Sequence, residues 1–347
     1  MKNGKLQAAV IGCGSISKVH ILGIQALEGV EIAAVCDIKP ERANAAAEAT
    51  GAKAYGNWHE VVALPEIDVV HICLPHYLHA PVAIEALGLG KNVLTEKPMA
   101  TTVADARAMI AASEKEGAGT LGVIFQNRYN AAVQKALQII QSGQMGAFKG
   151  ARAEVSWIRD RSYYVDSGWR GSKLTEGAGS LINQAIHTLD LLSYLGGPIK
   201  KVRGAVFTGL LEEDIEVEDN AMGVAIYEGG QRAIIHTTNN YVADAPVEVE
   251  LQMEKGVLKL YGNNLFKVEK ESFELIARGE NKSVVGKAYW GSSHGVQIED
   301  YYNSIRKGEK FWIDGRSGLP ALALVCAIVK SSEEGRWVKI ETAEEEE

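Results

Sequence analysis

The sequence predicts an α/β N-terminal Rossmann domain, followed by an α+β C-terminal domain with a large, mostly antiparallel open sheet. Up to residue 125, short apolar runs of strand length alternate with helical segments, as in a parallel sheet covered on both faces. After this point, longer stretches alternate apolar and polar residues between turns such as Glu228-Gly229-Gly230, which is typical of an antiparallel sheet with one solvated face. We therefore expect one domain over residues 1–124 and a second over residues 125–347, whose last helix can pack back on the first domain.

The first domain repeats a strand–helix pattern. Pro40 fits the first position of a helix, where its missing N–H leaves no bond unmade, and Asn57 is placed to cap a short helix. Strands are expected over residues 6–11, 32–36, 69–74, 92–95 and 121–125, and longer helices over residues 19–27, 40–51, 80–89 and 103–116.

The second domain opens with a helix and continues mainly as strands. Their alternating pattern places one side chain in two on the buried face of a sheet. Strands are expected over residues 149–157, 201–207, 221–227, 233–240, 247–253 and 257–261, and helices over residues 131–142, 185–194, 296–306 and 319–331.

Composition argues against several kinds of partner. The 347 residues are 46% hydrophobic, which suffices for two domains with separate cores. A net charge of -8 argues against a surface for nucleic acid or anionic lipid, and the longest apolar stretch, residues 321–329, is too short to span a bilayer. The four cysteines lie in apolar segments without a CxxC pair, which predicts reduced, buried thiols in a cytoplasmic protein.

A glycine loop follows the first strand and opens the first helix. Gly12, Gly14 and Ser17 occupy the three positions of a GxGxxG dinucleotide loop, with serine as the third. The first glycine permits the tight turn, and the second lets the backbone approach a pyrophosphate. Together with Ser15 and Ile16, these residues would direct helix N-terminal N–H groups at the phosphates.

Asp37 ends the second strand and stands where an acid would bind the ribose hydroxyls and repel a 2′-phosphate. The alternative is that Asp37 only caps the helix beginning at Pro40. Lys39 and Arg42 lie nearby and could tolerate a phosphate. We expect NAD rather than NADP.

Glu96-Lys97-Pro98 follows the strand over residues 92–95. In a Rossmann sheet this position is at the carboxyl edge, where the nicotinamide ring lies and where a dehydrogenase needs a proton-handling group. The alternative is an ordinary surface lysine.

These features resemble the Gfo/Idh/MocA oxidoreductases over essentially the whole chain. The resemblance rests on GCGSIS followed by His20, VCDIKPERA at 35–43, LPHYLHAPVAIEAL at 74–87, TEKPMA at 95–100 and GAGSLINQAIHTLDLLSYLGG at 177–197. The last two segments are specific for the family and say little about substrate. The family implies NAD(P)-dependent oxidation of a ring hydroxyl in a sugar or cyclitol, and an outer sheet face that mediates homodimers or homotetramers.

The resemblance also implies roles for individual residues in the N-terminal half. Lys97 matches the active-site lysine, and the bond to Pro98 is often cis in the family. A lysine ammonium can donate to the reacting oxygen and stabilise developing alkoxide charge. Glu96 is expected to anchor the strand end and contact the nicotinamide ribose. The cofactor would also be contacted from the loop after the preceding strand, by Leu74, Pro75 and His79.

His187 matches the catalytic histidine of the family. Asn183 lies four residues before it and Asp190 three after, so the three would share one helical face. Many family members carry Asp where this chain has Asn183. Because an amide does not stabilise imidazolium as a carboxylate does, we expect His187 to be less basic and Asn183 to bind a substrate hydroxyl. The alternative for His187 is a core histidine in a satisfied network.

Aromatic and arginine residues precede this helix and suit a polyhydroxylated ring, which has apolar faces and polar edges. Trp157 and Trp169 have the alternative of packing in the interdomain core, and Arg128 that of a structural ion pair. The candidate substrate residues are Arg128, Trp157, Arg159, Tyr163, Tyr164, Trp169 and Arg170, together with Asn183 and His187.

We expect the protein to oxidise a secondary ring hydroxyl of a sugar, glycoside or inositol to a ketone with NAD. Within this class, the C3 position of a glycoside is the favoured site of oxidation. The alternatives are a UDP-sugar 3-dehydrogenase, an NAD-retaining glycosidase or lyase that uses transient oxidation, and a noncatalytic NAD sensor. His76 and His79 form an HxxH pair without further ligands at suitable spacing, so no metal is expected.

Overall fold

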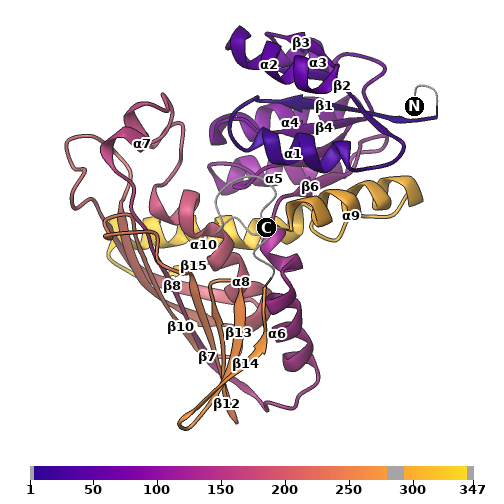
Figure 1. Ribbon diagram of the computed structural model, residues 1–347. Coiled ribbons are helices and arrows are strands. Elements are labelled where there is room, and N and C mark those ends of the chain that lie inside the picture. Colours follow the sequence, from indigo (N-terminus) through magenta and orange to yellow (C-terminus); the bar gives the residue numbers. More distant parts are fainter. Residues whose placement is uncertain (1–3, 280–292, 342–347) are drawn as a thin grey trace. The chain divides into compact units, whose positions relative to one another are not determined.

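The chain divides into two compact units in a computed structural model that describes residues 4–279 and 293–341 (Figure 1). Among these residues, the first unit contains 4–100, 104–126 and 293–318. The second unit contains 101–103, 127–279 and 319–341. No helix in the described ranges is both long and apolar enough to cross a membrane.

The first unit is built on a six-stranded parallel sheet in the order β3-β2-β1-β4-β5-β6. The central strands β1 and β4 are buried along their whole length, as expected for a parallel sheet covered on both faces. The strands are β1 Leu6–Ile11, β2 Val30–Cys36, β3 Lys53–Tyr55, β4 Val69–Ile72, β5 Asn92–Thr95 and β6 Leu121–Val123.

Helices connect these strands, and one further helix of this unit, α9, comes from late in the chain. An added Cβ at Gly23 of α1 would lie 2.7 Å from Cδ1 of Ile298, so α9 packs closely on α1 (Figure 1). The helices are α1 Ser17–Gln25, α2 Pro40–Thr50, α3 Trp58–Val62, α4 His79–Gly88, α5 Val103–Ser113 and α9 His294–Lys307.

The second unit is built on a nine-stranded sheet in the order β14-β13-β12-β11-β7-β10-β9-β8-β15. Only β10 and β7 pair in parallel, and every other neighbouring pair is antiparallel. The strands are β7 Phe148–Ser156, β8 Ile199–Phe207, β9 Asn220–Tyr227, β10 Arg232–Thr238, β11 Glu248–Met253, β12 Gly256–Tyr261, β13 Asn264–Glu269, β14 Ser272–Ala277 and β15 Val338–Lys339.

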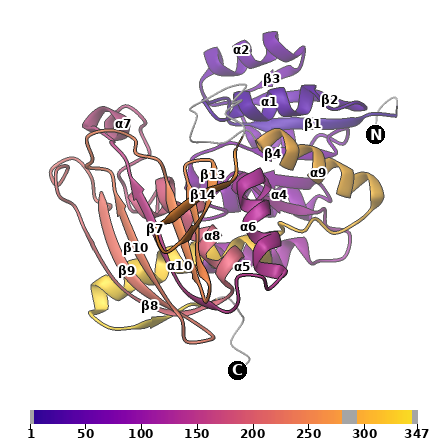
Figure 2. The same cartoon turned by 60° about the horizontal axis from the view of Figure 1, so that its bottom comes forward.

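Helices pack on this sheet, with α8 against β7 and β11 and α6 against β12 to β14 (Figure 2). A π-helical turn at Leu181–Ala185 leads directly into α8. The helices are α6 Ala131–Gln141, α7 Arg161–Val165, α8 Ile186–Gly196 and α10 Gly315–Glu334, of which α10 begins in the first unit and continues in the second.

The predicted fold class is confirmed, and Asn57 caps α3 by accepting the N–H of His59 at 3.1 Å. Five elements were not expected: β3, β13, β14, β15 and α7. The strand β14 is mostly exposed and β3 and β15 are short edge strands, so none has the apolar period that marks a strand.

Candidate functional site

The ends of four neighbouring strands of the first unit lie in register. Ile11 of β1 is paired with both Cys36 of β2 and Ile72 of β4, and Ile72 is paired with Thr95 of β5. The residues that follow each strand therefore meet at one edge of the sheet. The glycine loop, Asp37, Leu74 and the Glu96–Lys97 pair are brought together there, as the sequence predicted for a dinucleotide site.

Gly12 makes the tight turn at this edge. Its φ is 92°, and an added Cβ would lie 2.4 Å from the carbonyl oxygen of Cys73 after β4. A side chain is therefore excluded both by conformation and by the neighbouring backbone. The backbone of Gly12 therefore packs directly against the backbone of Cys73, just after β4.

The next residues leave the backbone accessible. An added Cβ at Gly14 meets no atom within 4 Å, Ser15 is exposed and Ile16 is half-buried. The buried Ser17 hydroxyl donates to the Gly14 carbonyl at 2.7 Å and begins α1. An open backbone before a helix N-terminus fits the pyrophosphate of a dinucleotide.

Asp37 joins the glycine loop to the turn before α2. Its carboxylate accepts the N–H of Cys13 and the N–H of Lys39, each at 2.9 Å. The carboxylate does not cap α2, whose N-cap is Lys39, so the simple capping alternative is not what the structure shows. Burial, and then the charge of Asp37, raise the pKa of the Cys13 thiol to about 11, so no thiolate would repel a bound phosphate. This donor and acceptor set fits NAD.

His79 ties two loops of the edge together. Its Nδ1 lies 2.7 Å from the carbonyl oxygen of Pro98, and its Nε2 lies 2.7 Å from that of Leu74. Burial lowers the pKa of His79, so the neutral ring donates to one of these carbonyls at a time. The contacts of His79, Leu74 and Pro75 with a cofactor stay predictions.

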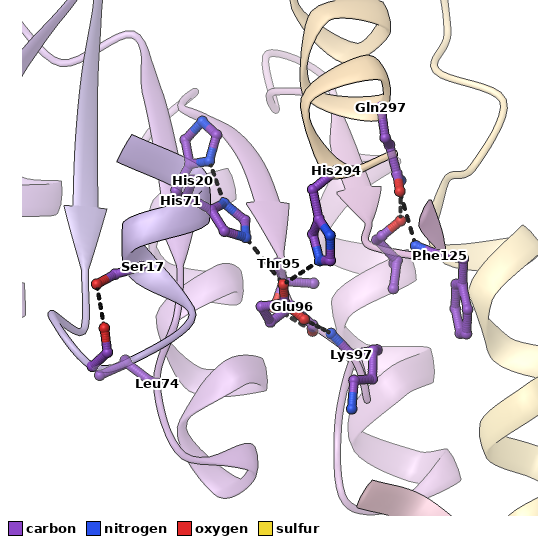
Figure 3. A network of polar contacts seen from close by, with 12 residues as sticks. Ser17, His20, His71, Leu74, Thr95, Glu96, Lys97, Phe125, His294 and Gln297 are labelled. Atoms are coloured by element: carbon purple, nitrogen blue, oxygen red, sulfur yellow. Dashed lines mark hydrogen bonds and ion pairs between the residues drawn. The ribbon is translucent and has the colours of Figure 1, made fainter. Parts of the chain in front are cut away.

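Glu96 follows β5 directly and lies in a buried histidine network (Figure 3). Its Oε1 is 3.0 Å from Nε2 of His20 and 3.6 Å from Nε2 of His294. Nδ1 of His20 lies 2.8 Å from Nδ1 of His71, whose Nε2 lies 3.0 Å from the hydroxyl of Tyr302. All five side chains belong to residues that are at most 5% exposed. The three histidines come from α1, β4 and α9. The sequence pointed to His20 through the family-like segment but predicted none of the contacts between these rings and Glu96.

The charge of Glu96 is set by this network. Burial alone would disfavour ionisation, but the interactions with His20 and His294 outweigh it and hold the pKa of Glu96 well below its usual range. Burial, and then His20, lower the pKa of His71. At neutral pH the network therefore contains an ionised Glu96 and a neutral His71.

Lys97 is the next residue and is half-buried. Its backbone N–H donates to Oε2 of Glu96 at 3.1 Å, and its bond to Pro98 is cis, as the resemblance implied. The ionised carboxylate thus holds the peptide unit that carries the lysine. Its proton-handling role stays a prediction.

Asn183 lies in the π-helical turn of the second unit, a type of turn often found at functional sites. Its Nδ2 donates at 2.5 Å to Oε1 of Glu176, whose Oε2 accepts the N–H of Gly171 at 2.6 Å. Asn183 and His187 are half-buried, whereas Asp190 is only 2% exposed. Asp190 is therefore the most buried of the three residues expected on one helical face.

Asp190 pairs with Arg128. The Arg128 Nε and Nη2 donate to the two carboxylate oxygens at 2.8 and 2.5 Å. Burial raises the pKa of Asp190, and the Arg128 charge opposes that shift. The ion-pair alternative for Arg128 is therefore present, and its contact with substrate stays a prediction.

Rings and guanidinium groups gather around Tyr163. The guanidinium carbon of Arg170 lies 4.3 Å from the Tyr163 ring centroid and 4.7 Å from that of Trp169. Arg159 lies 5.3 Å from the Tyr163 ring and 5.0 Å from the Trp157 ring. The arginines thus stack on rings of the protein itself, and the contact of this cluster with a sugar ring stays a prediction.

Two members of this cluster also make polar contacts with other parts of the second unit. Arg159 pairs with Asp244 at 2.7 Å, and the buried Trp157 donates its indole N–H to the Ala245 carbonyl at 3.0 Å. Trp157 thus packs within the second unit, and its contact with substrate stays a prediction.

Two side-chain amides bind the tyrosines of this cluster, and one of them, Gln184, was not predicted from the sequence. Nε2 of Gln184 donates to the hydroxyl of Tyr163 at 2.9 Å. Nδ2 of Asn239 donates to the hydroxyl of Tyr164 at 2.7 Å and to Oε1 of Gln184 at 3.0 Å. The position of Gln184, next to Asn183, was the available clue. The two tyrosine hydroxyls are thereby fixed, although Tyr164 itself is only 2% exposed.

Within residues 4–279 and 293–341, no group of three or more His, Cys, Asp or Glu residues could hold a metal ion. The rings of His76 and His79 lie 5.9 Å apart, and both nitrogens of His79 face backbone carbonyls.

Comparison with known proteins identifies the family. The family model described as an oxidoreductase family with an NAD-binding Rossmann fold matches residues 6–125, and the GFO/IDH/MocA C-terminal domain matches residues 133–259. The chain belongs to the Gfo/Idh/MocA oxidoreductase family. The predicted family and its NAD-binding domain are confirmed, and the expected class of NAD(P)-dependent dehydrogenase acting on CH–OH groups is confirmed at the level of the family.

Individual relatives are named for different substrates. The D-apiose dehydrogenase of Paraburkholderia graminis is 27% identical over 99% of this chain and 92% of its own. An inositol 2-dehydrogenase of Salmonella paratyphi B is 37% identical over 144 residues, so this chain matches only 43% of that relative's length.

Among solved structures, the WlbA dehydrogenase from Bordetella pertussis in complex with NADH and UDP-GlcNAcA has a TM-score of 0.86 and 29% sequence identity. The match covers 98% of this chain and 99% of that one. A levoglucosan dehydrogenase in complex with NADH and levoglucosan, at 23% identity and a TM-score of 0.87, shares the fold.

Proposed function

We propose that this protein is an NAD-dependent dehydrogenase that oxidises a secondary ring hydroxyl of a sugar, glycoside or inositol to a ketone. One observation supports it most: Lys97 follows β5 at the edge that also carries the glycine loop, and an ionised Glu96 holds its backbone N–H. A fixed lysine at this edge is what alcohol oxidation beside a nicotinamide requires.

The cofactor would be held by the residues of the sheet edge. NAD, when bound, supplies the acceptor for the hydride that leaves the carbinol carbon. Asp37 would accept hydrogen bonds from ribose hydroxyls and repel a 2′-phosphate, so comparable catalytic efficiency with NADP would contradict the preference for NAD. The proposed cofactor residues are Gly12, Gly14, Ser15, Ile16, Asp37, Leu74, Pro75, His79, Glu96 and Lys97.

Two side chains handle the proton in this proposal. The Lys97 ammonium donates to the reacting oxygen and stabilises the negative charge that develops there. Neutral His187 accepts the hydroxyl proton as the carbonyl forms, and Asn183 binds a neighbouring hydroxyl. Residues 1–124 would thus carry the cofactor, and residues 125–347 the substrate and oligomer contacts.

The substrate would bind against the rings and guanidinium groups of the second unit, with oxidation at C3. The contacts around Tyr163 support a polyhydroxylated ring. A second candidate, a UDP-sugar 3-dehydrogenase, is favoured by the likeness to the WlbA complex with UDP-GlcNAcA. A cytoplasmic homodimer or homotetramer, formed through the outer face of the nine-stranded sheet, completes the proposal.

NADH absorbance at pH ~8–9, above the usual imidazole pKa, tests this function with a panel of inositols, free sugars, aryl glycosides and UDP-sugars. NADH released with one group identifies the substrate class. No net NADH but cleavage of an aryl glycoside by protein with bound NAD would favour the NAD-retaining glycosidase. NAD binding without turnover of any compound would favour a noncatalytic sensor.

A further inference from the structure

Glu176 is a buried carboxyl group that the proposed mechanism does not use. Its residue is 0% exposed, and it lies in the loop before the π-helical turn. One carboxylate oxygen accepts the side-chain amide of Asn183 at 2.5 Å, and the other accepts the backbone N–H of Gly171 at 2.6 Å. Glu176 therefore connects the loop that carries Arg170 to the turn that carries Asn183.

The surroundings of Glu176 keep its charge adjustable near neutral pH. Burial raises the pKa of Glu176 to about 7, while its hydrogen bonds to Asn183 and Gly171 oppose that shift. The nearby charge of Arg170 also lowers this pKa, and that of Glu218 raises it. Tyr163 and Tyr164 each interact electrostatically with this carboxyl group.

The charge of a carboxyl group decides which end of an amide can face it. An ionised carboxylate only accepts hydrogen bonds, so only the Nδ2 end of Asn183 can point at it. A protonated carboxyl group brings an O–H donor, and the amide can then turn over and accept with Oδ1. The orientation of Asn183 is thus coupled to the proton on Glu176.

We propose that Glu176 is a positioning residue that holds the Asn183 amide with Nδ2 inward, so that Oδ1 is the atom that accepts a hydrogen bond from a substrate hydroxyl. This inference rests on the proposed function for the role of Asn183. It also places a carboxyl group beside the amide at position 183, where the family resemblance implies Asp. The acidic group of this region is supplied by residue 176, one hydrogen bond further into the protein.

The side-chain amide of Asn183 reports this coupling without any turnover. Protein labelled with ¹⁵N-asparagine gives the side-chain signal, which is assigned by its loss in Asn183→Gln. We expect its chemical shifts to titrate with a midpoint near pH 7, the pKa of Glu176. Glu176→Gln should abolish this titration.

Glu218→Gln is the matched control. Glu218 is also buried, with 5% of its residue exposed, and its carboxylate accepts the N–H groups of Gly179 and Leu181 in the same region. Because the charge of Glu218 raises the pKa of Glu176, its loss should lower the midpoint of the Asn183 titration but not abolish the titration. An Asn183 signal that does not titrate between about pH 5 and 9, or that titrates equally in Glu176→Gln because His187 is its source, would overturn the proposal.

Exchange of the acid and the amide gives a second test, in kinetics. Asn183→Asp puts a second carboxyl group against the buried Glu176, and two like charges in contact disfavour each other's ionisation. We expect kcat/KM to fall roughly 10- to 100-fold, and Asn183→Asp/Glu176→Gln to recover to within about tenfold of wild type. Full activity of both Asn183→Asp and Glu176→Gln, each tested alone, would overturn the role of Glu176.

The two tests separate this inference from the proposed function. A wild-type protein that oxidises no compound of the panel, but in which the Asn183 signal follows Glu176, contradicts the dehydrogenase and supports the coupled pair. Turnover with an Asn183 signal independent of Glu176 supports the dehydrogenase and overturns the pair.

Discussion

Glu96 in the first unit and Glu176 in the second are both buried glutamates that contact a residue proposed to act on substrate. The carboxylate of Glu96 contacts two imidazole groups and accepts the N–H of Lys97. The carboxyl group of Glu176 accepts hydrogen bonds from a neutral side-chain amide and from a backbone N–H. The pKa of Glu96 is held well below its usual range, and that of Glu176 is raised to about 7. The difference teaches that burial alone does not set the charge of an acid, since the partners decide whether desolvation prevails.

The largest expected effects concern the residues beside these acids. Lys97→Ala and His187→Ala should each lower kcat by about 10²- to 10⁴-fold, the usual contribution of a positioned proton-transfer group. NAD affinity, measured by calorimetry, should change far less. Lys18→Ala, at an exposed position of α1, and His236→Ala are the controls that should retain turnover. Near-normal kcat in either test variant would remove that residue from the mechanism.

Glu96→Gln should destabilise the protein by about 3–5 kcal/mol at pH 7, because two buried imidazoles lose their anionic partner. A depressed folded-state pKa contributes stability above the unfolded value of 4.5, and this contribution is lost as the pH falls below it. The difference in the free energy of unfolding between wild type and Glu96→Gln, measured with denaturant, should therefore become smaller at acidic pH.

The surface pair of His59 and Glu85 provides the matched control for Glu96. Its atoms approach to 2.9 Å, but the side chains are 57% and 37% exposed. Glu85→Gln should change the free energy of unfolding by less than about 1 kcal/mol. A Glu96→Gln cost as small as this would show that the histidine network does not depend on the charge of Glu96.

Glu176 should give a pH dependence of the opposite sign. A raised folded-state pKa contributes stability below the unfolded value of 4.5, and this is lost as the pH rises through about 7. At ~1.4 kcal/mol for each pH unit between these values, the loss amounts to about 3 kcal/mol. Glu176→Gln should flatten this part of the stability curve, while exposed Glu216, whose pKa is lowered, should leave it unchanged when replaced by Gln. Equal slopes in wild type and Glu176→Gln would contradict the raised pKa.

Sequence reasoning predicted the first of these acids better than the second. Glu96 stands in a strand-end motif beside Lys97, so its place at the sheet edge followed from the strand pattern. Glu176 lies in a Thr-Glu-Gly loop without periodicity, and its contact with Asn183 depends on how that loop folds onto the π-helical turn. The π turn itself was not predicted either, because such a turn has no distinct sequence period.

The histidine network could not be predicted for a related reason. His20, His71 and His294 lie on α1, β4 and α9, and only the packing of those elements brings their rings together. Buried parallel strands follow from continuous apolar runs, and half-buried strands and amphipathic helices from local periods of about 2 and 3.6 residues. Polar contacts between distant elements follow from tertiary packing. The fold class and the sheet-edge residues were therefore predictable, and the partners that set their charges were not.

The smallest expected effect lies at the far end of this network. Tyr302→Phe removes the hydroxyl that lies 3.0 Å from Nε2 of His71 and leaves a buried ring nitrogen without that partner. The free energy of unfolding should fall by about 1–2 kcal/mol, less than for Glu96→Gln because both groups are neutral. Tyr241→Phe, at a residue that is 47% exposed, should stay within about 0.5 kcal/mol of wild type. If Tyr302→Phe also costs nothing, the chain of hydrogen bonds that supports Glu96 ends at His71 rather than at α9.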